Sequence, residues 1–192
     1  MMRIRFILGV AALIGSGTAL AHTGSHAGGW AAGFAHPFMG LDHLLAMIAV
    51  GIWAVQLGGH HRLLLPAVFL AAMMAGATGA ASGLPLPQVE GMIAVSVLVL
   101  GMLVALAVRT QWHWPVSLVA LFALFHGHVH GTAMSELVAP WIYFSGFLLA
   151  TALLHALGLC AATVLKLHPR LIRAGGAVMS VAGTGLLVAA LI

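Results

Sequence analysis

The sequence predicts an all-α, polytopic membrane protein whose helices cross the bilayer several times. Of its 192 residues, 62% are hydrophobic and 5% are charged, whereas a soluble domain carries about 25% charged residues. The hydrophobic residues lie in runs of about 20, the length that a helix needs to cross the apolar core of a bilayer. A chain of this length therefore holds about six or seven spans with short loops and leaves no room for a soluble domain.

The first 21 residues have the pattern of a signal peptide that is cleaved after export. Arg3 and Arg5 precede a short apolar stretch at residues 6–14, and the Ala-Leu-Ala sequence at residues 19–21 matches a cleavage site. The apolar stretch is too short to cross a bilayer comfortably, and an uncleaved first span is the alternative. Cleavage would leave His22 as the mature N-terminus, in the periplasm of a bacterium.

Six apolar runs follow and predict a single transmembrane domain over residues 22–192. A Gly-Gly pair closes the first run, and a Gly-Leu-Pro-Leu-Pro stretch closes the second. A Trp-His-Trp-Pro stretch before the fourth run is typical of an aromatic belt at the membrane surface. The six transmembrane helices after the signal peptide are expected at about residues 38–57, 63–81, 89–108, 115–134, 141–166 and 171–192.

The basic residues predict how this bundle is oriented, because cytoplasmic loops carry an excess of Lys and Arg. With the mature N-terminus outside, the loops after the first, third and fifth helices face the cytoplasm. These loops hold all basic residues of the mature chain: Arg62, Arg109, Lys166, Arg170 and Arg173. We therefore expect a multi-pass protein of the bacterial inner membrane with both mature termini in the periplasm. Basic residues spread over several loops form no patch, so we expect no nucleic-acid partner.

One of the three acidic residues of the chain lies inside the first apolar run, beside two histidines. These residues are His36, Asp42 and His43. A charged carboxylate in the bilayer centre costs roughly 2.5–3.5 kcal/mol, and the neighbouring imidazoles suggest that a metal ion offsets this cost. On one ideal helix, His36 and His43 would stand about 10.5 Å apart along the axis, too far for a shared ion. Either the chain around Pro37 and Gly40 is not helical, or the two histidines serve successive sites on a path. Pro37 favours a helix start, which would leave His36 free to fold inward.

A second histidine group, His126, His128 and His130, lies in the fourth apolar run. His126 and His130 are four residues apart, so they share a helical face and can ligate one ion, whereas His128 points to the opposite side. A histidine pair that packs against its neighbours, or that ligates a haem, would give a similar pattern. Together the two groups predict a metal site at His36, Asp42, His43, His126 and His130.

Five further residues are candidates for the metal site or for a path that leads to it. Glu90 begins the third run, where the helix dipole alone also favours a carboxylate. His155 is a single histidine in the fifth run, and His22 would offer a free amine and an imidazole after cleavage. The remaining two are His128 and Glu136, an acidic residue just beyond the fourth run.

These motifs together resemble the HupE/UreJ family of nickel/cobalt permeases, which are hydrogenase and urease accessory membrane proteins. That family has a signal peptide, a first-span pattern of His, five residues and Asp-His, and a fourth-span pattern close to Phe-His-Gly-x-Ala/Val-His-Gly-x-Glu. The first pattern is complete from His36 to His43. The second begins at Phe125 and departs at its last position, where Ala133 stands in place of Glu and Glu136 is the nearest acid.

The resemblance implies a secondary transporter that moves Ni²⁺, or Co²⁺, into the cytoplasm for urease or hydrogenase maturation. The divalent ion is then transported cargo, and we expect no tightly bound cofactor and no enzymatic activity. Imidazole nitrogen is a ligand that suits nickel. The sequence has no nucleotide-binding motif, so energy would come from a gradient or a coupling partner. The alternative is an intramembrane zinc-dependent hydrolase, which also combines Asp and His at lipid depth but needs a ligated water and a general base.

Overall fold

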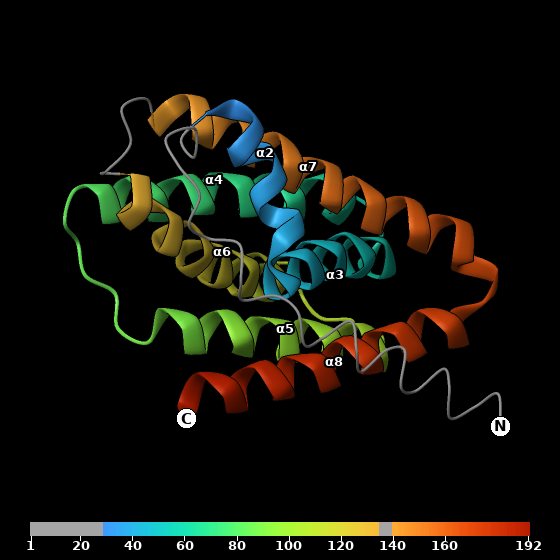
Figure 1. Cartoon of the computed structure of the whole chain (residues 1–192). Coiled ribbons are helices and arrows are strands. Elements are labelled where there is room, and N and C mark those ends of the chain that lie inside the picture. Colours follow the sequence, from blue (N-terminus) through green and yellow to red (C-terminus); the bar gives the residue numbers. More distant parts are fainter. Residues whose placement is uncertain (1–28, 135–139) are drawn as a thin grey trace, which may run out of the picture.

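The computed structural model describes residues 29–134 and 140–192, which form helices and their connections (Figure 1). Within these residues no strand occurs, and the predicted all-α fold is confirmed. In chain order the elements are α2 (Trp30–Met39), α3 (Leu41–Leu57), α4 (His61–Ala81), α5 (Val89–Leu106), α6 (His113–Met134), α7 (Pro140–Val164), the short 3-10 helix η1 (Leu165–Leu167) and α8 (Pro169–Leu191).

Successive long helices run in opposite directions between the two ends of a bundle, which lie at the left and right of Figure 1, so successive connections lie at opposite ends. Helix α3 lies among the others and contacts α4, α5 and α7, so its residues 49–54 are all buried. Helix α4 pairs with α6, α2 packs on α7, and α5 pairs with α8 along one edge of the molecule (Figure 1). The apolar core therefore surrounds α3, which carries Asp42 and His43.

Small residues set the close approach of several helix pairs. Gly76 of α4 packs directly on the backbone of Leu124 in α6, and a Cβ atom on Gly127 of α6 would overlap the carbonyl oxygen of Met73 in α4. Gly176 brings α8 against the backbone of α5 in the same way. The contacts between α4 and α6 fix the position of α6 along the bundle axis, and with it the positions of the α6 histidines.

Several helices are long and apolar enough to cross a membrane. Four qualify singly, namely α4, α5, α7 with η1, and α8, and the bent pair α2–α3 counts as a fifth if it is one span. Helix α6 has 22 residues but is not among them; its histidines lower its hydropathy. The length and apolar composition of these helices make the chain a multi-pass membrane protein, while the count of six spans stays a prediction. The predicted signal peptide lies outside the described residues.

The first span differs from the expectation. A helix that begins near residue 38 was expected, but α2 begins at Trp30 and Pro37 lies inside it, so the predicted helix start at Pro37 is wrong. Helix α2 ends before Gly40, whose backbone is extended with φ −95° and ψ 116°, and α3 leaves at an angle of 82°. The close packing of α2 on α7 explains why α2 forms, because a Cβ atom on Gly33 would overlap the backbone of Tyr143.

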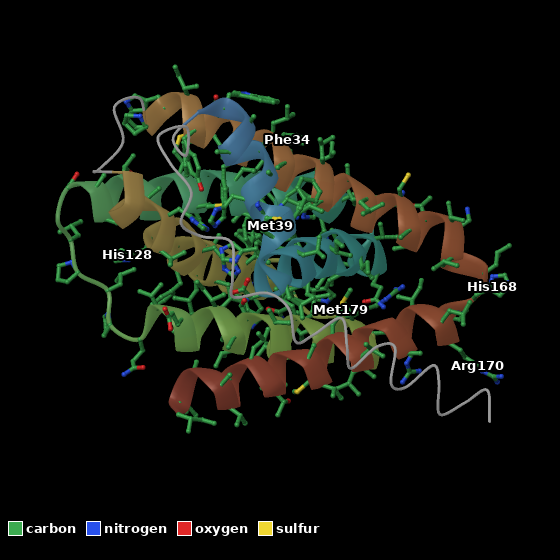
Figure 2. The ribbon with its side chains drawn as sticks, viewed as in Figure 1. Phe34, Met39, His128, His168, Arg170 and Met179 are labelled. Carbon is green, nitrogen blue, oxygen red and sulfur yellow. The ribbon has the colours of Figure 1, made fainter. Side chains whose placement is uncertain are left out.

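The charged residues separate toward the two ends of the bundle. The basic ones lie at the end where α3, α5 and α7 finish, and Figure 2 labels Arg170 there. Asp42 and Glu90 open α3 and α5, toward the opposite end. This separation is what the charge pattern predicts, while the side of the membrane that each end faces stays a prediction.

Candidate metal centre

The break at Gly40 brings His36 and His43 together, although they belong to different helices. Their ring centroids lie 6.3 Å apart. Of the two alternatives, the first holds at Gly40, where the helix breaks, but not at Pro37, which lies inside α2. A Cβ atom at Gly40 would lie 2.7 Å from Oδ1 of Asp42 and 3.2 Å from Nδ1 of His43. The missing side chain therefore leaves the space into which the Asp42 carboxylate turns.

Asp42 orients the imidazole of His43. One carboxylate oxygen, Oδ1, accepts the backbone N–H of His43 at 2.7 Å and lies 2.7 Å from Nδ1 of the same residue. Because a carboxylate only accepts, the ring proton is on Nδ1 and the lone pair of a neutral ring is on Nε2. A carboxylate that holds a histidine in this way is the usual outer neighbour of a metal-ligating imidazole. Asp42 is therefore placed to support His43 as a ligand.

The Nε2 atom of His43 points at α6. It lies 2.7 Å from Nε2 of His130, and both residues are buried. Two imidazole nitrogens at this distance share one proton, so His130 donates and His43 accepts. The first-span motif and the fourth-span motif thus meet in the interior of the bundle.

His126 lies one helical turn before His130 and is completely buried. Its Nδ1 donates to the carbonyl oxygen of Phe122 at 3.0 Å, which leaves the lone pair on Nε2. Within the described part of the chain, this Nε2 has no hydrogen-bond partner. A buried nitrogen lone pair of this kind is costly unless something binds it.

We call the four imidazoles of His36, His43, His126 and His130 the histidine cluster. Ring centroids are 4.7 Å apart for His36 and His130, 4.7 Å for His43 and His130, and 4.9 Å for His43 and His126. Phe147 of α7 covers the cluster, with its ring centroid 4.4 Å from that of His130. The structure therefore brings all five residues of the predicted metal site together, with Asp42 at the edge.

The rings of the cluster touch one another directly. Nitrogens bound to one metal ion at about 2.0–2.1 Å would stand about 3 Å apart or more, farther than the 2.7 Å between His43 and His130. Over residues 29–134 and 140–192, no group of three or more His, Cys, Asp or Glu side chains is arranged to hold a metal ion as these side chains stand. Binding of an ion thus requires the rings to move apart by a few tenths of an ångström.

Glu90 lines the same cavity as Asp42 and His43. A hollow of about 330 Å³ is lined by Asp42 and His43 of α3 and by Glu90 of α5. The C-terminal turns of α8, including Ala189 and Ala190, complete its wall. Glu90 itself is exposed, so the cavity offers an open approach with two carboxylates to the buried rings.

His155 lies deeper, beyond the histidine cluster. Its Nδ1 donates to the carbonyl oxygen of Met47 at 2.8 Å, and its buried Nε2 has no hydrogen-bond partner among the described residues. The ring of Phe69 lies between, with its centroid 5.5 Å from the ring of His126 and 4.9 Å from that of His155. Sequence reasoning missed Phe69 and Phe147, because a phenylalanine in an apolar run carries no local sign that it touches a histidine.

His128, the other described candidate on α6, does not join the cluster. His128 faces the opposite side of α6, as expected, and its Nε2 donates to the carbonyl oxygen of Leu84 at 2.8 Å, near the α4–α5 connection (Figure 2). His22 and Glu136 lie outside the described residues.

Comparisons with known proteins agree with the pattern of these residues. The family model described as HupE / UreJ protein matches residues 10–186 of the chain. A relative described as Protein HupE, from Rhizobium leguminosarum bv. viciae, is 42% identical over 181 residues, which cover 93% of this chain and 95% of the relative. No solved structure matches the chain.

Proposed function

Because the chain belongs to the HupE/UreJ family, we propose that it is a permease that moves Ni²⁺, or Co²⁺, across the bacterial inner membrane. The ion would serve the maturation of hydrogenase or urease, in keeping with the hydrogenase and urease accessory role of this family. The ion is cargo and not a resident cofactor.

The observation that carries this proposal is the meeting of His43 and His130 beside Asp42, inside a bundle of apolar helices. Polar and charged groups are expensive at lipid depth and usually mark the route of an ion or a proton. Imidazole nitrogens suit nickel, cobalt, copper and zinc, whereas magnesium and calcium prefer oxygen ligands. A set of four imidazoles with one supporting carboxylate therefore favours a transition-metal cation.

The arrangement also supports a direction of movement. The Glu90–Asp42 cavity would attract a hydrated cation and lead it to His43. The histidine cluster would then replace part of its water shell. His155, whose Nε2 has no hydrogen-bond partner among the described residues, lies farther along the interior. Rings that must separate to bind an ion hold it less tightly than a preformed site, and a permease needs binding that is loose enough for release.

Uptake of radioactive Ni²⁺ by cells that express the protein tests this proposal. We expect uptake above that of control cells, competition by Co²⁺, and loss of uptake in His43→Ala. His113→Ala is the matched control, because His113 is an exposed histidine at the other end of α6. No uptake by the native chain, or equal uptake by both variants, would contradict the proposal.

A further inference from the structure

A second cavity lies at the basic end of the bundle, and no residue of the histidine cluster lines it. It measures about 240 Å³ and opens where α3, α5, α7 and α8 end or begin. Three basic side chains line it, Arg109, Lys166 and Arg173, together with Gln56 and apolar residues such as Ile172. Cavity walls with three cations point to an anion as the occupant.

These cations have no carboxylate to neutralise them in the described part of the chain. The one ion pair found there joins Asp42 and His43. Glu90, the other described acid, lines the cavity toward the opposite end of the bundle. Three like charges around one small cavity repel one another unless an anion lies between them.

Hydrogen bonds hold the walls of this cavity in place. Nε of Arg173 donates to the carbonyl oxygen of Ala105 at 2.7 Å, which leaves the outer guanidinium N–H groups for another acceptor. Nε2 of Gln56 donates to the carbonyl oxygen of Val104 at 3.0 Å, and its buried Oε1 has no hydrogen-bond partner among the described residues. The site thus offers several charged donors and one unused acceptor.

We propose that this basic cavity binds the phosphate headgroup of an anionic phospholipid. Phosphate is the anion that Arg and Lys clusters recognise best, and basic pockets between transmembrane helices are known to take such headgroups. The cavity lies at the ends of two candidate spans, α7 with η1 and α8, which is the depth of lipid headgroups. Its apolar residues, Val55, Ala162 and Ile172 among them, suit the first part of an acyl chain. The unused Gln56 acceptor suits a hydroxyl donor, such as the glycerol headgroup of phosphatidylglycerol.

Native mass spectrometry of the full chain in detergent micelles, with equal amounts of phosphatidylglycerol and phosphatidylcholine, tests the proposal. We expect the native protein to retain phosphatidylglycerol in preference. In detergent the lipid is retained by the side chains that contact it, and each basic side chain in contact with an anionic headgroup strengthens binding by about fivefold. The double variant Arg109→Gln/Lys166→Gln should therefore lose about 25-fold of this preference, and Lys166→Gln alone about fivefold.

The matched control is Arg62→Gln/Arg170→Gln, which removes two basic charges from the same end of the bundle but none from the cavity. We expect it to retain phosphatidylglycerol as the native protein does. An equal loss in both double variants would mean general attraction to the basic end and would overturn the proposal, as would unchanged retention in Arg109→Gln/Lys166→Gln. Inorganic phosphate at millimolar concentration separates the two sources of the anion. Displacement of the lipid by inorganic phosphate would overturn the assignment to a lipid, whereas no displacement supports it.

Discussion

The Nε2 atoms of His43 and His130 lie 2.7 Å apart, although 87 positions separate the two residues in the chain. Asp42 fixes the proton on the far nitrogen of His43, so this contact joins a lone pair to the N–H of His130. An ion that binds both rings must take the place of this hydrogen bond. The two family motifs therefore act as one unit, and the first two predictions depend on it.

Two histidines of α6 should respond differently to substitution. His130→Ala removes a ring that contacts both His36 and His43, and we expect Ni²⁺ uptake to fall by about tenfold or more. His128→Ala removes a buried ring and its bond to Leu84, which lowers stability, but uptake per amount of protein should stay near that of the native protein. Uptake is measured per amount of protein in the membrane. The reverse order of effects would mean that the opposite face of α6 lines the path.

Asp42→Asn should weaken ion binding without loss of the fold. An asparagine oxygen can still accept from His43, but the negative charge that favours a divalent cation is gone. Loss of a carboxylate that supports a ligating histidine costs about 10–100-fold in metal affinity. Calorimetric titration of the purified variant with Ni²⁺ measures this change. An affinity equal to that of the native protein would show that the carboxylate has a structural role alone.

His155→Leu tests whether His155 contributes to transport of the ion and not to its binding at the histidine cluster. The substitution removes the unpartnered Nε2 and the bond to Met47, but it leaves the four rings of the histidine cluster in place. We expect Ni²⁺ to bind with nearly native affinity, while the rate of uptake falls by about tenfold, the lower end of the effect seen when a polar neighbour of a metal site is lost. A native uptake rate would place His155 off the path and leave it as a buried structural histidine.

Gly127→Ala should disturb the pairing of α6 with α4. The new methyl group would overlap the carbonyl oxygen of Met73, and the two helices would have to separate and carry the cluster histidines with them. We expect a lower thermal unfolding temperature in detergent and reduced uptake. Gly175→Ala is the matched control, because a Cβ atom there meets nothing within 4 Å. Equal behaviour of the two variants would contradict this account of the packing.

Reporter fusions test the orientation in the membrane. Fusions at Arg62 and Arg109 should report the cytoplasm, and a fusion at Pro85 should report the periplasm, because cytoplasmic loops carry the basic residues. The α4–α5 connection that contains Pro85 lies at the end of the bundle opposite to Arg62. A periplasmic signal at Arg109 would overturn the predicted topology.

The sequence predicted much of the site because its residues lie in two short motifs on apolar helices. Asp42 is recognisable as a carboxylate in an apolar run. The four-residue spacing of His126 and His130 places both side chains on one face of the helix. The break at Gly40 could be stated only as one of two alternatives, and α2 was not foreseen. Helix α2 packs closely on α7 through Gly33, and no local pattern reveals a contact between segments so far apart. The same limit hid Phe69, which is recognised only by its contacts with two histidine rings.

The separation of acidic and basic residues toward the two ends of the bundle has an energetic consequence. In the predicted orientation, a divalent cation passes from the Asp42–Glu90 cavity toward the basic end, in the direction that an inside-negative membrane potential drives it. Two elementary charges gain about 4.6 kcal/mol from each 100 mV. That is enough to sustain roughly a thousandfold accumulation of the ion without nucleotide hydrolysis. The cell voltage itself would then serve as the energy source for uptake, and an ionophore that collapses it should abolish accumulation while leaving binding unchanged.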